Sequence, residues 1–183
     1  MENPVWSFIN LPKKKEDVLD VLAVLPAFNG LSRNELKLVE RMLHERRYKK
    51  GEIVFNEGEP GAGMYIVITG QIEILRKIKS GSDVSLAIIK EHSFFGELAL
   101  LDEIPRSASA FAVTDSVLFG FSKPSLEGLC SRNPRLGIKI LSNLSRLVCK
   151  RLVKSNEAME KVQGGFPGKD AESGSAESMS SNV

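Results

Sequence analysis

The hydrophobic and polar positions of the chain follow two different periods, which change near residue 45. Between residues 17 and 45, apolar residues recur at the three- and four-residue spacing of helices that bury one face. Pro26 and the pair Asn29-Gly30 interrupt this run. Ser32 followed by Glu35 forms a capping box, which predicts the start of a second helix. The first part of the chain is therefore predicted to be helical.

From Tyr48 to Ser122 the pattern changes to short β-rich runs that are separated by turns. Glycines lie between the runs, where the chain has to reverse its direction. A spacing of about ten residues between runs predicts a compact antiparallel roll or barrel. The runs cover residues 53–55, 64–68, 72–78, 84–89, 108–113 and 117–121.

Helical periodicity returns after Pro124 and, more strongly, after Pro134. Apolar residues from Leu141 to Met159 mark one face of a helix that is expected to run from about residue 134 to 163. This face is compatible with a hinged lid, with a dimer seam, or with packing against its own domain alone. The sequence leaves these three alternatives open.

Three regions are expected along the 183 residues: an arm over 1–17, one domain over 18–163 that includes the long helix, and a disordered tail over 164–183. The length suffices for one domain with a full core. The tail is dominated by Gly, Ser, Ala and Glu, which bury too little apolar surface to order a chain.

Charge and hydropathy argue against nucleic-acid and membrane partners. The chain has 25 Lys and Arg against 23 Asp and Glu, so its net charge of +2 provides no strong field for either surface. No apolar stretch reaches the ~18 residues of a membrane helix. The first residues lack the pattern of a secretory signal, so we expect a cytoplasmic protein.

The residues that most often carry metal or catalytic chemistry are few and scattered. Cys130 and Cys149 are expected to be reduced thiols rather than a disulfide. With His44 and His92 they do not form a zinc-binding spacing. No Ser-His-Asp or Cys-His arrangement has local support. We therefore expect no metal, no catalytic residue and no enzymatic activity.

The segment 95–110 carries the candidate chemistry of the chain. Gly96 allows a close approach of the backbone, and the helix-forming run 97–101 begins directly after it. The start of a helix presents free N–H groups and a positive dipole end, which suit phosphate. Arg106 follows Pro105 at the expected start of the next strand, where its guanidinium can bind two phosphate oxygens. These features predict an anion site.

Glu97 indicates that the ligand has a second polar group. A carboxylate would repel the ligand if the site served phosphate alone. One helical turn from the phosphate, it can instead accept a hydrogen bond from a ribose 2′-hydroxyl while Arg106 neutralises the phosphate charge. A cyclic nucleotide offers both groups close together.

The same segment resembles the phosphate-binding cassette of cyclic-nucleotide-binding domains. The resemblance lies in the run Phe-Gly-Glu-Leu-Ala and in Pro-Arg-Ser-Ala, whose arginine follows the glutamate by nine positions. It extends to Lys50-Gly51-Glu52 and to the runs 57–61 and 64–70, and covers about residues 30 to 160. The family includes bacterial catabolite activators, protein kinase A regulatory subunits and cyclic-nucleotide-gated channels.

The resemblance implies a mainly β fold: an eight-stranded antiparallel β-roll of jelly-roll type, also described as a double-stranded β-helix, with N-terminal helices and a long C-terminal helix. It implies that Glu97 binds the ribose 2′-hydroxyl and that Arg106 pairs with the cyclic phosphate. Backbone or hydroxyl donors would come from Gly96, Leu98, Ala99, Ser107 and Ala108. An apolar wall near the base would comprise Ile74, Leu86 and Ala87.

The function implied is that of a regulatory sensor or adaptor, which binds a cyclic nucleoside monophosphate, needs no cofactor, and signals by movement of its C-terminal helix. We expect the ligand to be cyclic AMP rather than cyclic GMP. A protein partner or a second copy would read this movement through that helix. The alternative is a ligand-free scaffold for protein contacts on the same fold. The chain departs from the family in His92-Ser93, where Gly-Asp is common, and we expect no DNA-binding or catalytic module after the long helix.

Overall fold

The computed structural model describes residues 18–78 and 81–163. The predicted arm over 1–17 and the predicted disordered tail over 164–183 lie outside the described residues. The chain divides after Val148 into two compact units. The first unit holds the sheets and most of the helices, and the described part of the second is the distal half of the last helix.

The N-terminal region forms two short helices and one 3₁₀ turn: α1 (Val18–Val24), η1 (Pro26–Phe28) and α2 (Arg33–Glu40). The expected capping box starts α2, because the Ser32 hydroxyl accepts from the Glu35 N–H at 3.3 Å and the Glu35 carboxylate accepts from the Ser32 N–H at 2.7 Å. These elements bury Leu22, Leu25 and Phe28.

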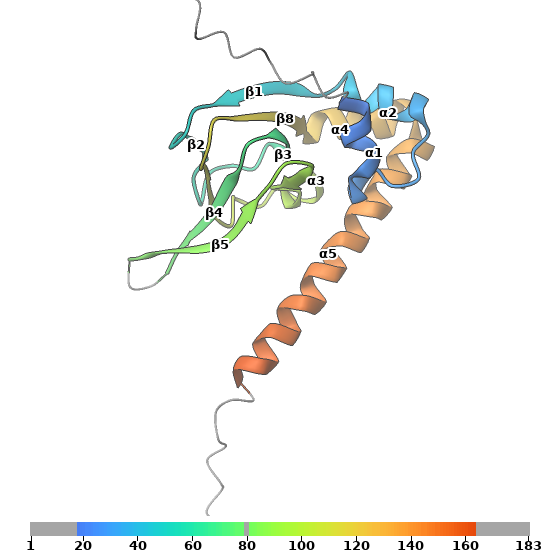
Figure 1. The fold of residues 1–183 in the computed structure, drawn as a ribbon. Coiled ribbons are helices and arrows are strands. Elements are labelled where there is room, and N and C mark those ends of the chain that lie inside the picture. Colours follow the sequence, from blue (N-terminus) through green and yellow to red (C-terminus); the bar gives the residue numbers. More distant parts are fainter. Residues whose placement is uncertain (1–17, 79–80, 164–183) are drawn as a thin grey trace, which may run out of the picture. The chain divides into compact units, whose positions relative to one another are not determined.

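The predicted antiparallel β-roll is confirmed, with eight strands in the described residues. They form two four-stranded sheets, in the orders β1-β8-β3-β6 and β2-β7-β4-β5. Figure 1 shows β1, β8 and β3 of the first sheet one beside the other. Every strand pair is antiparallel. The strands are β1 (His44–Tyr48), β2 (Ile53–Phe55), β3 (Gly63–Thr69), β4 (Ile72–Lys77), β5 (Asp83–Ile89), β6 (Ser93–Phe95), β7 (Ser109–Ala112) and β8 (Ser116–Ser122).

Three details differ from the sequence prediction. Strand β1 begins at His44, inside the region predicted as helical. The sequence did not predict this strand, because His-Glu-Arg-Arg-Tyr lies at a sheet edge and has no apolar alternation. Strand β6 was not among the predicted runs. Arg106 was expected at the start of a strand, but β7 begins only at Ser109, so Arg106 lies in the connection before it.

Apolar side chains pack in two clusters. The larger one lies between the helices and one face of the sheet that contains β3 and β8, and it includes Ile66 and Phe121. The smaller one lies inside the roll and includes Val67, Phe95 and Leu118. Since neighbouring residues of a strand point to opposite faces, β3 and β8 contribute to both clusters.

Helices α3 (Leu98–Leu101), α4 (Lys123–Arg132) and α5 (Pro134–Gln163) complete the described chain. α5 covers the predicted range, and within the first unit it buries Leu136, Ile140 and Leu144. In the second unit, residues 149–160 are all exposed. Cys130 and Cys149 are free thiols. None of the helices in the described ranges is long and apolar enough to cross a membrane.

Candidate functional site

The turn between β6 and α3 is built around Gly96. Its φ of +75° lies in the left-handed region that favours glycine. A Cβ atom at this position would also lie 2.6 Å from Nη1 of Arg106. Gly96 is therefore required twice, once by its own backbone conformation and once by the guanidinium that packs against it.

The backbone of Arg106 is held by the loop that follows β2. Its N–H donates to the carbonyl of Glu59 at 2.8 Å, and its carbonyl accepts from the N–H of Gly58 at 2.8 Å. An isolated bridge joins Pro60 to Pro105 directly beside these bonds. The position of Arg106 thus depends on a loop that precedes it by almost fifty residues.

The Arg106 side chain is only 7% exposed and contacts aromatic rings. Its Cζ lies 4.1 Å from the ring centroid of Phe55 and 5.8 Å from that of Tyr65, a cation–π arrangement. Nη1 donates to the Gly96 carbonyl at 3.3 Å. Burial lowers the pKa of Arg106, while Tyr65 and Glu59 act in the opposite direction.

One polar atom of this buried guanidinium lacks a partner. Nε of Arg106 has no hydrogen bond to any residue within 18–78 or 81–163. A buried polar group without a partner is costly, and more so when it is charged. An anion bound at Arg106 would supply the missing acceptor and the missing negative charge.

Glu97 lies next to Gly96 and is 3% exposed. It precedes α3, a single helical turn in which the Leu100 N–H donates to the Glu97 carbonyl at 3.0 Å. Since the Arg106 guanidinium packs on Gly96, the two charged residues of the predicted site are buried at the same turn. Ala99 lies in α3 itself. Gly61 packs closely against it, since a Cβ on Gly61 would lie 2.6 Å from the Cβ of Ala99.

The remaining predicted residues differ in their surroundings. Leu98 is 36% exposed, Ser107 is exposed and Ala108 is buried. Ile74 of β4 packs against the cluster inside the roll and pairs with Ala87 of β5. Leu86 is 54% exposed and lies at a register shift of β5, without a partner in β4.

Phe55 and Tyr65 were not predicted as residues of the site. Each was assigned only to a β-rich run, although both contact Arg106. The rings also pack on each other, with centroids 6.0 Å apart. Neighbouring Tyr48 has its pKa raised to about 12, by burial first and by Tyr65 next. No local signal reveals such contacts, because the residues are about forty or fifty positions from Arg106.

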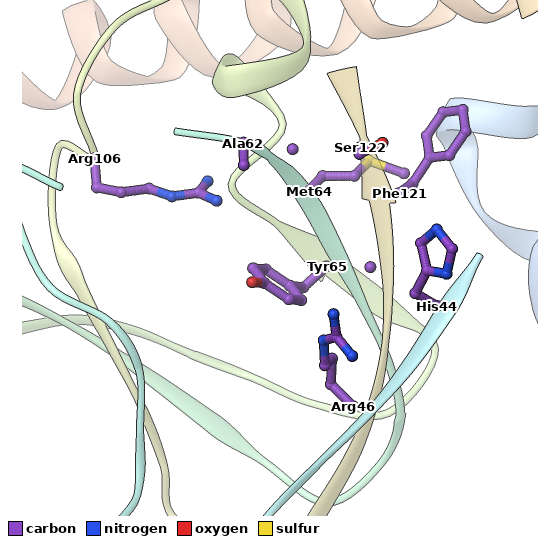
Figure 2. Close-up of a pocket in the computed structure, with 10 residues that line it drawn as sticks. His44, Arg46, Ala62, Met64, Tyr65, Arg106, Phe121 and Ser122 are labelled. Carbon is purple, nitrogen blue, oxygen red and sulfur yellow. The ribbon is translucent and has the colours of Figure 1, made fainter. Parts of the chain in front are cut away.

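A pocket of about 150 Å³ adjoins Arg106 (Figure 2). Residues 96–99 do not line it, although Gly63, whose carbonyl oxygen would lie 3.4 Å from a Cβ on Gly96, does. Among the residues that the structure describes, no group of three or more His, Cys, Asp or Glu side chains could hold a metal ion. The lining residues are His44, Arg46, Ala62, Gly63, Met64, Tyr65, Arg106, Gly120, Phe121 and Ser122.

Comparison with protein families matches residues 45–133 to the cyclic nucleotide-binding domain. Among curated proteins, the chain is 34% identical over 127 residues to the cyclic AMP receptor protein of Thermus thermophilus, covering 69% of this chain and 57% of that protein. The chain therefore spans somewhat more than half the length of this relative.

Solved structures of similar fold include a catabolite activator protein and a regulatory domain of PKA. The catabolite activator protein of Thermus thermophilus aligns with a TM-score of 0.69 and 31% identity, over 75% of this chain and 63% of that one. The regulatory domain of PKA from Toxoplasma gondii, crystallised with cAMP, aligns with a TM-score of 0.59 and 26% identity, over 62% and 43% of the two chains.

Proposed function

This chain belongs, through residues 45–133, to the cyclic nucleotide-binding domain family, and we propose that it is a regulatory sensor that binds cyclic AMP at Arg106 and Glu97. The observation that carries the proposal is the buried guanidinium of Arg106, whose Nε has no partner in the described residues. A cyclic phosphate is a monoanion that can accept from Nε and neutralise the guanidinium. Binding would thus remove an existing cost from the fold.

The other contacts follow from the turn around Gly96. The Glu97 carboxylate accepts a hydrogen bond from the ribose 2′-hydroxyl. Donors around the phosphate come from Gly96, Leu98, Ala99, Ser107 and Ala108. The base lies near Ile74, Ala87 and Leu86, and the exposure of Leu86 leaves apolar surface for a ligand to cover.

Cyclic AMP is the proposed ligand, in preference to cyclic GMP. The Thermus thermophilus relative is named for cyclic AMP, and the Toxoplasma gondii domain was crystallised with cAMP. A hydroxyl at Ser107 fits the phosphate of cyclic AMP, although the same hydroxyl could also bind guanine. Calorimetry with both nucleotides therefore belongs to the test.

The proposed signal is a movement of α5. A ligand shifts such an element only by its different affinity for the two positions. The apolar stripe of α5 is buried at Leu144 but remains exposed at Leu152 and Met159. This exposed continuation is the surface through which we propose that a protein partner or a second copy reads the movement.

The test is a titration of the full chain with cyclic AMP and cyclic GMP by calorimetry. Replacing Arg106 with Ala is expected to weaken binding by about 2–5 kcal/mol, the usual effect of removing one member of a buried charged pair. Arg47→Ala is the matched control, because Arg47 is exposed and already paired with Glu45 at 2.7 Å. It should leave the affinity unchanged.

Two outcomes would contradict the proposal. Equal affinity of the wild-type and Arg106→Ala chains would remove Arg106 from the site. Absence of binding and of any thermal stabilisation with either nucleotide, while a protein partner co-purifies, would favour the ligand-free scaffold.

A further inference from the structure

The pocket beside Arg106, called here the β1 pocket, is lined by more basic than acidic side chains. Two arginines and a histidine are among the residues that line it, namely Arg46, Arg106 and His44, and no acidic residue does. Figure 2 shows Arg46 and Arg106 extending toward Tyr65 from different directions. Charges of the same sign that share a hollow repel each other, so an anion between them would be attracted.

The strand register explains why a hollow exists at this place. His44 of β1 pairs with Gly120 of β8, which in turn pairs with Tyr65 of β3. The three positions therefore form a row across the sheet, and the middle one has no side chain. A Cβ on Gly120 would meet Tyr65 at 3.6 Å, so even a methyl group would take up space in the hollow.

The described residues compensate only part of the charge at this pocket, where Glu59 acts electrostatically on Arg106. Arg46 and His44 make no ion pair with any residue in 18–78 or 81–163. Arg47, the next residue in β1, points to the other face and pairs with Glu45. Arg106 adds a side chain that is more than nine-tenths buried and has an unpartnered Nε.

We propose that the β1 pocket binds a phosphate dianion between Arg46 and Arg106, as a second ligand besides the cyclic nucleotide, with which it would share Arg106. Two guanidinium groups can each donate two hydrogen bonds to phosphate oxygens, and His44 can donate another. A volume of about 150 Å³ is far above the ~10–15 Å³ that one water molecule needs, so a tetrahedral anion fits. The ligand is inorganic phosphate or the phosphate group of a small monoester.

The direct test needs no cyclic nucleotide, so it stands or falls separately from the sensor proposal. The full chain is titrated with inorganic phosphate and, in parallel, with glycerol 3-phosphate, at constant ionic strength. Backbone amide NMR signals of residues 44–48 and of Gly120 report binding. A response to both compounds identifies the phosphate group itself as the ligand. A response to only one identifies that compound as the source.

The variants make the test specific. Arg46→Gln should weaken phosphate binding by about tenfold or more, because it removes the charged guanidinium and its hydrogen bonds to the phosphate. Arg47→Gln removes the same charge from the same strand but from the opposite face, and should leave binding within about twofold. Gly120→Ala should weaken binding without changing any charge, because its methyl group occupies the hollow.

Three results would overturn the proposal. Equal weakening by Arg46→Gln and Arg47→Gln would mean a diffuse surface charge and no site. Signal changes at residues 96–99 that neither variant affects would place the phosphate at the turn around Gly96 instead. No saturable signal change with either phosphate compound would mean that the pocket binds no phosphate.

A second readout rests on the proposed function. If Arg106 also binds the cyclic phosphate, the two anions compete for one guanidinium, and each weakens the binding of the other by the same factor. Phosphate should then lower the affinity for cyclic AMP by about fivefold or more. In Arg46→Gln this dependence on phosphate should disappear, while binding of cyclic AMP in phosphate-free buffer remains. A phosphate effect of equal size in Arg46→Gln would contradict the linkage.

Discussion

At the scale of single residues, the candidate site depends on the close packing of the Arg106 guanidinium against Gly96. Gly96 has a positive φ, and its missing side chain leaves room for Nη1 of Arg106. These are separate demands on one position, and they can be separated by experiment. A second glycine of the chain, Gly30, has the same φ of +75° with no atom within 4 Å of a Cβ.

Gly96→Ala and Gly30→Ala therefore form a matched pair. Both variants should lose about 1 kcal/mol or more of unfolding free energy from backbone strain, since alanine is disfavoured at positive φ. Only Gly96→Ala should displace Arg106 and weaken cyclic AMP binding, as measured by denaturant unfolding and calorimetry on the same samples. If Gly30→Ala weakened binding as much, the loss would come from stability and not from the guanidinium.

At the scale of secondary-structure elements, one buried polar side chain joins α5 to the N-terminal region. Asn143 is 7% exposed and its amide donates to the carbonyls of Ala27 at 3.2 Å and Asn29 at 2.9 Å. Its carbonyl oxygen accepts from Arg146 at 3.2 Å. The side chain thus satisfies carbonyls at the end of η1, which has no further helical turn to do so.

Asn143→Ala is expected to lower the unfolding free energy by about 1–3 kcal/mol, because it removes the donor to the buried carbonyl of Ala27 and to the part-buried carbonyl of Asn29. Ser145→Ala, on the exposed face of the same helix, is the control and should change stability by less than about 0.5 kcal/mol. Urea unfolding followed by circular dichroism measures both. Equal stability of the two variants would show that the amide contributes nothing to the attachment of α5.

At the scale of the whole molecule, the chain divides within α5 rather than between helices. The buried apolar side chains of this helix, Leu136, Ile140 and Leu144, all precede the division after Val148. Beyond it, Leu152, Val153 and Met159 are more than half exposed. The core of the first unit is therefore formed by its own residues, whereas the apolar side chains at 149–160 are all exposed.

A chain that ends at Val148 should unfold within a few degrees of the full chain, because it keeps every residue that is buried in the described part of the chain. It should also be monomeric in sedimentation analysis, whereas the full chain should associate through the exposed stripe. Leu152→Glu with Met159→Glu, in the full chain, should reproduce the monomer at unchanged length. A full chain that is monomeric at high concentration would exclude the second copy as the reader of α5.

Much of this fold could be predicted from local pattern. Turn glycines and β-rich runs predicted six of the strands, and the capping box predicted the start of α2. Strand β1 could not be found in this way, because it is polar and is ordered by pairing with β8, which lies about seventy residues later. Its identity depends on tertiary contacts and not on its own alternation.

The residues of the candidate site were likewise predicted where they lie in one local segment and not where they depend on distant contacts. Gly96, Glu97 and Arg106 could be singled out because they lie within one short segment with an unusual combination of turn, carboxylate and guanidinium. Phe55 and Tyr65 could not, since nothing near them in the sequence indicates a cation. The β1 pocket could not be predicted from the sequence either, because its prediction requires the register of β1, β8 and β3.

The hydrogen bonds from Arg106 to Gly58 and Glu59 limit the insertions and deletions that the loop around these two residues can tolerate. Surface loops ordinarily tolerate a gain or loss of residues. Here the stretch from Asn56 to Gly61 serves as a template for a distant arginine, so a one-residue insertion would shift the guanidinium away from its rings. In a scan of insertions and deletions, this loop should behave like a ligand-binding segment although none of its side chains is assigned to the ligand.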